Sequence, residues 1–298
     1  MSPDPANPTV GVLAALGTAL AWTLISLIAR SLSSEFSAFS LNIIRSGVGS
    51  VLLVPVALTL GDPANLARVS PLSWTYLAIS VITSVGVGDT AFFESARTLG
   101  LARAMTISTC YPLAASVLAV GLFGERITAV DAAGSVVTLG GLVLIVSERA
   151  PASAETGDAR GRGLGLAFLA AGAWAVSATL MKPPLAEIDP LTIQAVRLPL
   201  TALALWATPW ARGTARGLWA RRQAVGPRIL AMGTLTAITA VTFFTGLKHA
   251  GVTLGTVLSA TSPLFALPIG LLAFGERVTW RAVAGAALCV AGIGLLSL

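Results

Sequence analysis

Three charged side chains, those of Arg45, Asp89 and Arg197, stand inside long apolar stretches of the sequence. A charge is costly in hydrocarbon, so it usually pairs with another charge, reaches water or binds a ligand. Arg45 and Asp89 fall at similar depths in two consecutive apolar segments. We therefore expect either a structural ion pair between them, or a gate, a proton site or a substrate site that uses them.

Arg197 has a different setting, because no acid in the second half of the chain lies at its depth. An unpaired buried arginine is expensive, so it should contact water, backbone carbonyls, a distant acid or an anionic ligand. Asn42 and Gln194 each precede an arginine by three residues, which places amide and guanidinium on one helical face. Each pair predicts a polar strip that faces the interior. A substrate carboxylate at Arg197 is one interpretation.

Two tryptophans lie near the middle of apolar segments. Trp22 and Trp174 would each need a partner for the indole N–H there, whereas tryptophan at the membrane interface is the commoner use. Both could face a central cavity, and packing alone explains them equally well.

Two prolines fall in mid-segment, within Tyr111-Pro112 and Ser262-Pro263. Proline has no N–H to donate and lets a helix bend or break. Some membrane proteins are built from two repeats, and interrupted helices at matching positions of the repeats often line their binding sites. A packing kink, with the nearby hydroxyls bonded to their own helix, is an equally good interpretation.

The composition sets the environment of these residues. The chain has 298 residues, of which 55% are hydrophobic and 11% are charged, and its mean hydropathy is +0.84. Soluble domains carry about 25% charged residues, so this is a polytopic membrane protein. The net charge of +6 comes mostly from arginines between the apolar segments, and no nucleic-acid partner is expected. The two cysteines lie inside apolar segments, which argues against a disulfide framework, a metal cluster or a cofactor.

The two halves of the chain repeat one another. Pro112 matches Pro263, and the Phe-Gly-Glu-Arg sequence at 123–126 matches that at 274–277, both at an offset of 151 residues. Trp22 matches Trp174 and Arg45 matches Arg197 at an offset of 152. The position that matches Asp89 is Ala240. Such a repeat indicates an internal duplication.

Ten apolar segments are long enough to span a bilayer, at about 20 residues for about 30 Å. They cover residues 9–31, 37–60, 72–96, 101–123, 127–147, 163–182, 190–211, 226–247, 252–274 and 278–298. The predicted fold is all-α and integral to the membrane, with ten transmembrane helices as two inverted five-helix repeats. The repeats cover 1–148 and 163–298, and 149–162 is a linker.

The basic residues predict the orientation. Thirteen lysines and arginines fall on the side without the termini, and four fall on the side with them. The side with more positive charge is normally cytoplasmic, so both termini should lie outside.

This pattern resembles the drug/metabolite transporter superfamily, and specifically the ten-helix EamA-type carriers. The resemblance rests on the two five-helix halves, the mid-segment prolines of the fourth and ninth segments, and the Gly-Glu-Arg that follows each. It covers about 90% of the chain. It implies a secondary transporter in the inner (plasma) membrane that moves a small polar metabolite by alternating access. In many such carriers both termini lie in the cytoplasm, whereas the arginine count predicts the reverse here.

The charged and aromatic side chains indicate the class of substrate. An unpaired arginine, aromatic residues and a possible acid suit an amino acid or an organic anion, and we expect export. No nucleotide-binding loop is present, so the energy should come from a gradient or from exchange. We expect the chain to work as a monomer in the lipid bilayer, with a small-molecule substrate as its partner.

Two other classes remain as alternatives. Gly86-Val87-Gly88-Asp89 resembles the motif of intramembrane aspartyl proteases, which need a second aspartate at the same depth. The other candidate, Asp131, begins a segment from the opposite face. A passive channel is the third class, and it would give flux without counterflow.

Overall fold

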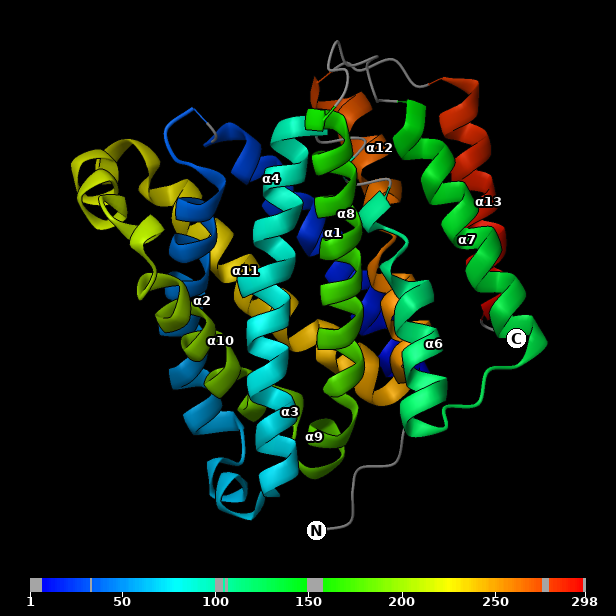
Figure 1. Ribbon diagram of the computed structural model, residues 1–298, viewed down its shortest axis with the longest axis horizontal. Helices are drawn as coiled ribbons and strands as arrows, with labels where there is room; N and C mark the ends of the chain where they lie inside the picture. Colours follow the sequence, from blue (N-terminus) through cyan, green and yellow to red (C-terminus); the bar gives the residue numbers. More distant parts are fainter. Residues whose placement is uncertain are drawn as a thin grey trace.

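The computed structural model describes residues 7–32, 34–99, 104, 107–148, 158–274 and 279–296, and the regular elements in these ranges are all helical. Figure 1 shows the helices lying alongside one another in a single bundle. The all-α prediction is therefore confirmed for the described part of the chain.

Each half of the chain contains both long and short helices. Those of the first half are α1 (Pro8–Ser31), α2 (Ala38–Leu60), the 3-10 helix η1 (Pro63–Arg68), α3 (Pro71–Val81), the π-helical segment η2 (Ile82–Asp89), α4 (Thr90–Leu99), α6 (Tyr111–Phe123) and α7 (Ala129–Glu148). Those of the second half are α8 (Asp158–Leu180), α9 (Lys182–Glu187), α10 (Pro190–Trp206), η3 (Pro209–Ala211), α11 (Thr214–Ser259), α12 (Ser262–Phe274) and α13 (Trp280–Leu296).

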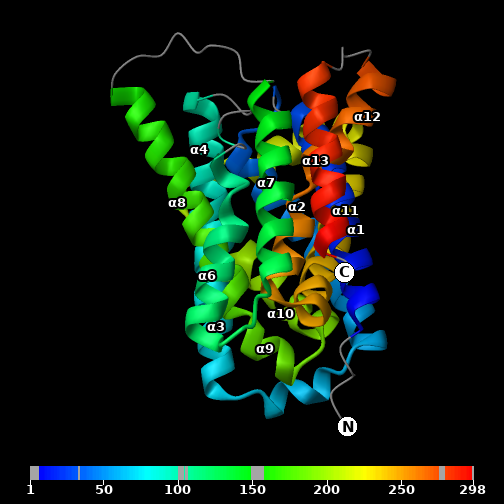
Figure 2. The same cartoon turned by 90° about the vertical axis from the view of Figure 1, so that its right-hand side faces the viewer.

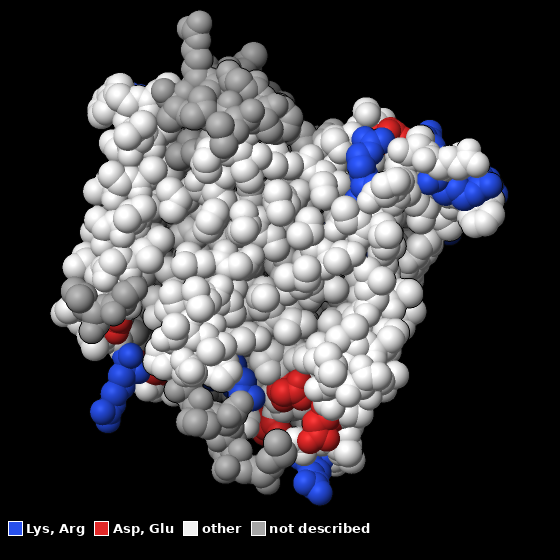
Figure 3. All heavy atoms as spheres, turned by 180° about the vertical axis from the view of Figure 1, so that it is seen from behind, with Lys and Arg blue, Asp and Glu red and all other residues white. Residues whose placement is uncertain are grey.

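Five helical segments in the described part are long and apolar enough to cross a membrane, and these segments are Pro8–Ala29, Phe39–Leu60, Pro71–Ala96, Arg160–Glu187 and Pro209–Ser259. Shorter apolar helices cover Tyr111–Phe123, Ala129–Ile145 and Trp280–Leu296. Figure 3 shows charged side chains near the upper and lower ends of the visible face, with a wide uncharged band between them. The fold is that of a multi-pass membrane protein.

Helices α2 and α10 begin at equivalent positions of the repeat. Ser37 Oγ accepts a 3.1 Å hydrogen bond from the Ser40 N–H at the start of α2. Asp189 Oδ1 accepts a 2.8 Å hydrogen bond from the Thr192 N–H at the start of α10. The capping oxygens stand 152 residues apart, as Arg45 and Arg197 do. Because both helices are fixed at the same register, their arginines lie at the same distance from the helix start.

The prolines that mark the fourth and ninth segments stand where the helix is interrupted. Residues 109–110 and 260–261 form turns, and α6 and α12 begin directly after them, at Tyr111 and Ser262. In both helices proline is the second residue, where its missing N–H costs nothing. The proline therefore starts a new helical segment after each turn.

The π-helical segment η2, which carries Asp89 at its end, was not expected from the residue pattern. The wider turn lets the backbone of Gly88 approach the ring of Trp174. A Cβ added to Gly88 would lie 2.5 Å from Trp174 Cδ1 and 2.6 Å from its Nε1. Glycine is therefore required here because Trp174 occupies the space of a side chain.

Helices α7 and α13 are equivalent in the two halves and pack side by side (Figure 2). A Cβ added to Gly141 would lie 2.5 Å from the carbonyl oxygen of Gly285. Cys289 Sγ donates to the carbonyl oxygen of Thr138 at 3.4 Å across the same contact. The spaced glycines let the two backbones touch, which is how helices associate in an apolar solvent.

Helix α11 turns sharply at Gly251, whose φ of 82° lies in the left-handed region that favours glycine. The turn frees the N–H groups of Val252 and Thr253, which donate to the Glu125 carboxylate at 3.3 and 3.0 Å. Lys182 Nζ donates to the same carboxylate at 2.8 Å. Burial by itself would raise the pKa of Glu125, but these hydrogen bonds and the charge of Lys182 hold it below its ordinary value.

Helix α8 begins at Asp158, so residues 158–162 of the predicted linker 149–162 are helical. Residues 149–157 lie outside the described part of the chain. The second Phe-Gly-Glu-Arg sequence also falls largely outside it, at residues 275–277.

Candidate functional site

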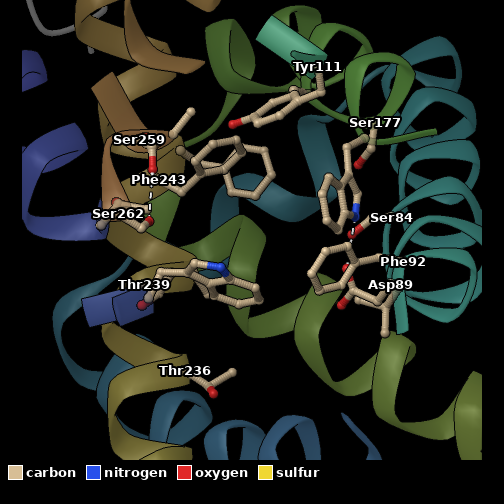
Figure 4. Close-up of a pocket in the computed structure, with 18 of the residues that line it drawn as sticks. Ser84, Asp89, Phe92, Tyr111, Ser177, Thr236, Thr239, Phe243, Ser259 and Ser262 are labelled. Carbon is tan, nitrogen blue, oxygen red and sulfur yellow. Dashed lines mark hydrogen bonds between the residues drawn. The ribbon is translucent and has the colours of Figure 1, made fainter. Parts of the chain in front are cut away.

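A cavity of about 230 Å³ lies in the interior of the bundle (Figure 4). Its walls come from both halves of the chain. Asp89 and Phe92 lie on one wall, and Thr239, Ser259 and Ser262 lie on the facing wall (Figure 4). The residues singled out from the sequence that line it are Trp22, Arg45, Asp89, Tyr111, Trp174, Gln194, Arg197, Ser262 and Pro263. Asn42 and Pro112 are buried behind the lining.

Arg45 and Asp89 form an ion pair, which is one of the two arrangements that their depths predicted. Arg45 Nη2 lies 2.7 Å from Asp89 Oδ2, and the two side chains are 9% and 8% exposed. Arg45 Nε donates to Asn42 Oδ1 at 2.6 Å, so the amide of Asn42 holds the guanidinium from behind. The charges are thus compensated at a site that excludes most water, where the attraction is least screened.

Two tryptophans from equivalent positions complete this pair in different ways. Trp174 Nε1 donates to Asp89 Oδ1 at 2.8 Å, so both carboxylate oxygens are occupied. The guanidinium carbon of Arg45 lies 5.2 Å from the ring centroid of Trp22, within range of a cation–π interaction. The N–H of Trp174 therefore has the partner that a buried indole requires.

Arg197 is held by hydroxyl and carbonyl groups. Its Nε donates to Ser80 Oγ at 3.2 Å, and its Nη2 donates to Ser80 O at 3.2 Å and to Ser177 Oγ at 3.0 Å. Phe244 lies under the guanidinium, with the ring centroid 4.9 Å from Cζ. None of the described carboxylates lies within 4.0 Å of its nitrogens. The guanidinium charge of Arg197 therefore lacks the direct partner that Arg45 has.

Gln194 makes fewer hydrogen bonds than its equivalent Asn42, whose Oδ1 accepts from Arg45 while its Nδ2 has no partner in the described part of the chain. Both atoms of the Gln194 amide group are buried and have no hydrogen-bond partner in the described part of the chain. Three hydroxyls that line the cavity, those of Ser46, Thr239 and Ser259, are also buried without a partner there. Unsatisfied buried polar groups are costly. A ligand with hydrogen-bonding groups would satisfy them.

Aromatic rings make up much of the remaining lining. The Trp174 ring centroid lies 5.3 Å from that of Phe92 and 6.0 Å from that of Tyr111. Phe243 and Phe244 stand edge to face, with centroids 5.0 Å apart. Rings at these distances pack favourably, so they form a firm apolar wall around the charged groups.

The groups at the helix breaks are partly used within the bundle. Tyr111 donates its O–H to Thr256 O at 3.3 Å, and Ser262 Oγ donates to Ser259 O at 3.5 Å. Thr23 Oγ1 donates to Ser262 O at 2.8 Å, which ties α1 to the second break. The hydroxyls therefore do bond nearby backbone, and Tyr111 and Ser262 line the cavity as well.

Sequence reasoning missed several residues that line the cavity or contact its lining. Ser80 and Ser177 hold Arg197, but serine in an apolar helix carries little signal by itself. Phe92 and Phe243 match at the repeat offset of 151, and that match could have identified them. Thr236 and Thr239 lie one turn apart on α11, and no match at the repeat offset identified them.

The residues needed by the protease alternative do not meet. Asp131 lies at the start of α7, where its Oδ2 accepts hydrogen bonds from the Thr128 N–H and Oγ1 at 2.9 and 2.8 Å. Asp89 instead lies in the cavity, paired with Arg45. Glu94 lies 4.0 Å from Arg162 and does not line the cavity. In the described part of the chain no group of three or more His, Cys, Asp or Glu side chains could hold a metal ion.

Known proteins resemble this chain over nearly its whole length. The model of the EamA-like transporter family matches residues 9–147 and 161–298. An uncharacterized transporter of Archaeoglobus fulgidus is 26% identical over 288 residues, which cover 96% of this chain and 98% of that protein. A solved crystal structure of a protein superposes with a TM-score of 0.76 at 20% identity, covering 96% of this chain and 94% of that one. At that identity it shows a shared fold.

Proposed function

The chain belongs to the EamA-like transporter family, and from this membership we propose that it is a secondary transporter for a small polar metabolite. The substrate is an amino acid or an organic anion, and the direction is export. Transport proceeds by alternating access, in which the central cavity opens to one side of the membrane at a time.

The architecture that this mechanism needs is ten transmembrane helices in two inverted five-helix repeats. The equivalent caps at Ser37 and Asp189 support it, and so do the helix breaks before Pro112 and Pro263. Two equivalent halves can exchange conformations across a site at their boundary. The cavity lies at such a boundary, because both halves contribute to its lining.

The observation that carries the proposal is the state of Arg197. It is a buried guanidinium that lines the cavity with no described carboxylate within 4.0 Å of its nitrogens, and the unsatisfied amide of Gln194 stands three residues before it on the same helix. A substrate carboxylate would supply both a counter-charge and hydrogen-bond acceptors. The aromatic wall would then contact the apolar part of the substrate.

The orientation is a separate part of the proposal. The count of thirteen basic residues against four supports an orientation with both termini outside the plasma membrane. In a protein without its two native cysteines, new cysteines at positions 5 and 215 are labelled from outside intact cells. Labelling at position 5 alone supports the orientation, and labelling at 215 alone overturns it.

The function is tested with purified protein in liposomes. Liposomes are loaded with one unlabelled amino acid or organic acid and diluted into the labelled compound. We expect counterflow, which is transient accumulation of label driven by exchange, and its loss in Arg197→Ala. Flux without counterflow would indicate a channel. Cleavage of a membrane protein that Asp89→Ala abolishes would replace the transporter with a protease.

A further inference from the structure

An arginine-rich surface lies at one end of the bundle, apart from the cavity. It consists of Arg212, Arg216, Arg221, Arg222 and Arg228, around the start of α11. Figure 3 shows basic side chains gathered at the upper right of the visible face, at the end where α11 begins. We call these five residues the arginine surface.

Acidic residues neutralise little of this charge. Glu35 lies 3.9 Å from Arg221 and 3.5 Å from Arg228. Arg212, Arg216 and Arg222 have no described carboxylate within 4.0 Å. All three are exposed. The surface therefore presents a concentrated positive charge for an anionic partner.

Tryptophan side chains flank the same surface. Trp210 and Trp219 are each 70% exposed, although such large apolar rings are usually buried. The guanidinium of Arg222 lies 4.5 Å from the ring centroid of Trp219. Exposed leucines, Leu203 at 65% and Leu230 at 55%, follow on α10 and α11. The positive charge of the arginine surface therefore lies beside apolar side chains that lipid acyl chains would cover.

We propose that the arginine surface binds the headgroups of anionic phospholipids. Guanidinium groups bind phosphate oxygens with paired hydrogen bonds, and tryptophan prefers the depth of the headgroups. A soluble anionic partner would explain the arginines but not the exposed tryptophans and leucines next to them. A lipid explains both, because its phosphate and its acyl chains lie side by side. The inference is independent of the transported substrate.

The test measures the affinity of spin-labelled phosphatidylglycerol, relative to spin-labelled phosphatidylcholine, for the full-length protein in phosphatidylcholine vesicles. Each basic residue near the lipid surface strengthens the attraction roughly fivefold. We expect the parent to prefer phosphatidylglycerol, and Arg216→Gln with Arg222→Gln to lose most of that preference. Added salt should weaken it, because exposed charges are screened.

Two control proteins separate a specific surface from a general charge effect. Arg68→Gln with Arg126→Gln removes two exposed arginines outside this surface and should keep the preference. Arg216→Lys with Arg222→Lys keeps the charge and should keep most of it, which also shows that the positions tolerate substitution. The proposal is overturned if the Arg216 and Arg222 glutamine variant retains the parent's preference, or if both glutamine variants lose it equally.

Discussion

The indole N–H of Trp174 donates a 2.8 Å hydrogen bond to Oδ1 of Asp89, which joins the second half of the chain to the π-helical segment of the first. Asp89 also pairs with Arg45, so one carboxylate links helices of both halves. Its repeat equivalent, Ala240, can make no such contact. The duplicated halves therefore meet at a site that is not symmetric. One half has an arginine in a direct ion pair, and the other has an arginine with no described carboxylate within 4.0 Å.

Gly88→Ala should displace Trp174, because the new Cβ would lie 2.5 Å from Trp174 Cδ1. Phe92 and Tyr111 pack against the ring, so it cannot move without disturbing them. We expect a loss of about 1–3 kcal/mol in the free energy of unfolding and reduced transport. Melting temperature and tryptophan fluorescence measure this. Gly86→Ala is the matched control, since nothing lies within 4 Å of its Cβ; equal effects of the two substitutions would refute the explanation.

Arg45→Ala should leave Asp89 buried without its cation. Breaking a buried pair costs about 3–5 kcal/mol, and less where water enters. The double variant Arg45→Ala with Asp89→Ala should recover part of the loss, because it removes the stranded charge. Denaturant unfolding of the parent, the two single variants and the double variant gives the coupling. Strict additivity of the two single changes would mean that the ion pair contributes nothing.

Arg197→Ala should cost less stability than Arg45→Ala. Ser80 Oγ and Ser177 Oγ already lie within hydrogen-bond distance of each other at 2.8 Å, so neither is stranded. The affinity for a carboxylate substrate should fall by about 1.5–3 kcal/mol, the scale of a charged hydrogen bond. Titration calorimetry of the parent and the variant measures it. An unchanged affinity would remove Arg197 from the binding site.

Gly141→Ala should weaken the contact between α7 and α13, because its Cβ would lie 2.5 Å from Gly285 O and 2.8 Å from the backbone nitrogen of Cys289. Backbone atoms cannot yield as a side chain does, so we expect a loss of about 1–3 kcal/mol. Gly140→Ala has nothing within 4 Å and should be neutral, or stabilising by up to about 1 kcal/mol through helix propensity. Thermal melts in detergent compare the two, and a neutral Gly141→Ala would contradict the packing observed.

The ionisation of Glu125 should make the free energy of unfolding depend on pH. Its pKa is lower in the folded protein than in the unfolded chain, so the folded state favours the carboxylate. Its contribution is fully present above the unfolded pKa of about 4.3 and is lost as the pH falls through the folded value. As the pH is lowered, the melting temperature of the parent should fall more steeply than that of Glu125→Gln. Parallel curves would show that Glu125 does not stabilise the turn at Gly251.

The sequence by itself determined the features that depend on composition and local pattern. Its apolar content identified a membrane protein, and the repeat placed Arg45 with Arg197 and Trp22 with Trp174 before any contact was known. The depths of Arg45 and Asp89 predicted that they lie close together, because consecutive antiparallel segments bring equal depths together, and an ion pair was one of the two interpretations. Proline chemistry likewise indicated the helix breaks.

Only the tertiary structure decided which side chains meet across the halves. The contacts of Trp174 with Asp89, of Arg197 with Ser80 and of Thr253 with the Glu125 carboxylate all join residues far apart in the chain. Such contacts depend on the rotation of each helix about its axis and on which helices are neighbours. Hydrophobic periodicity is weak in a chain that is apolar on nearly every helix face, so packing alone fixes these rotations.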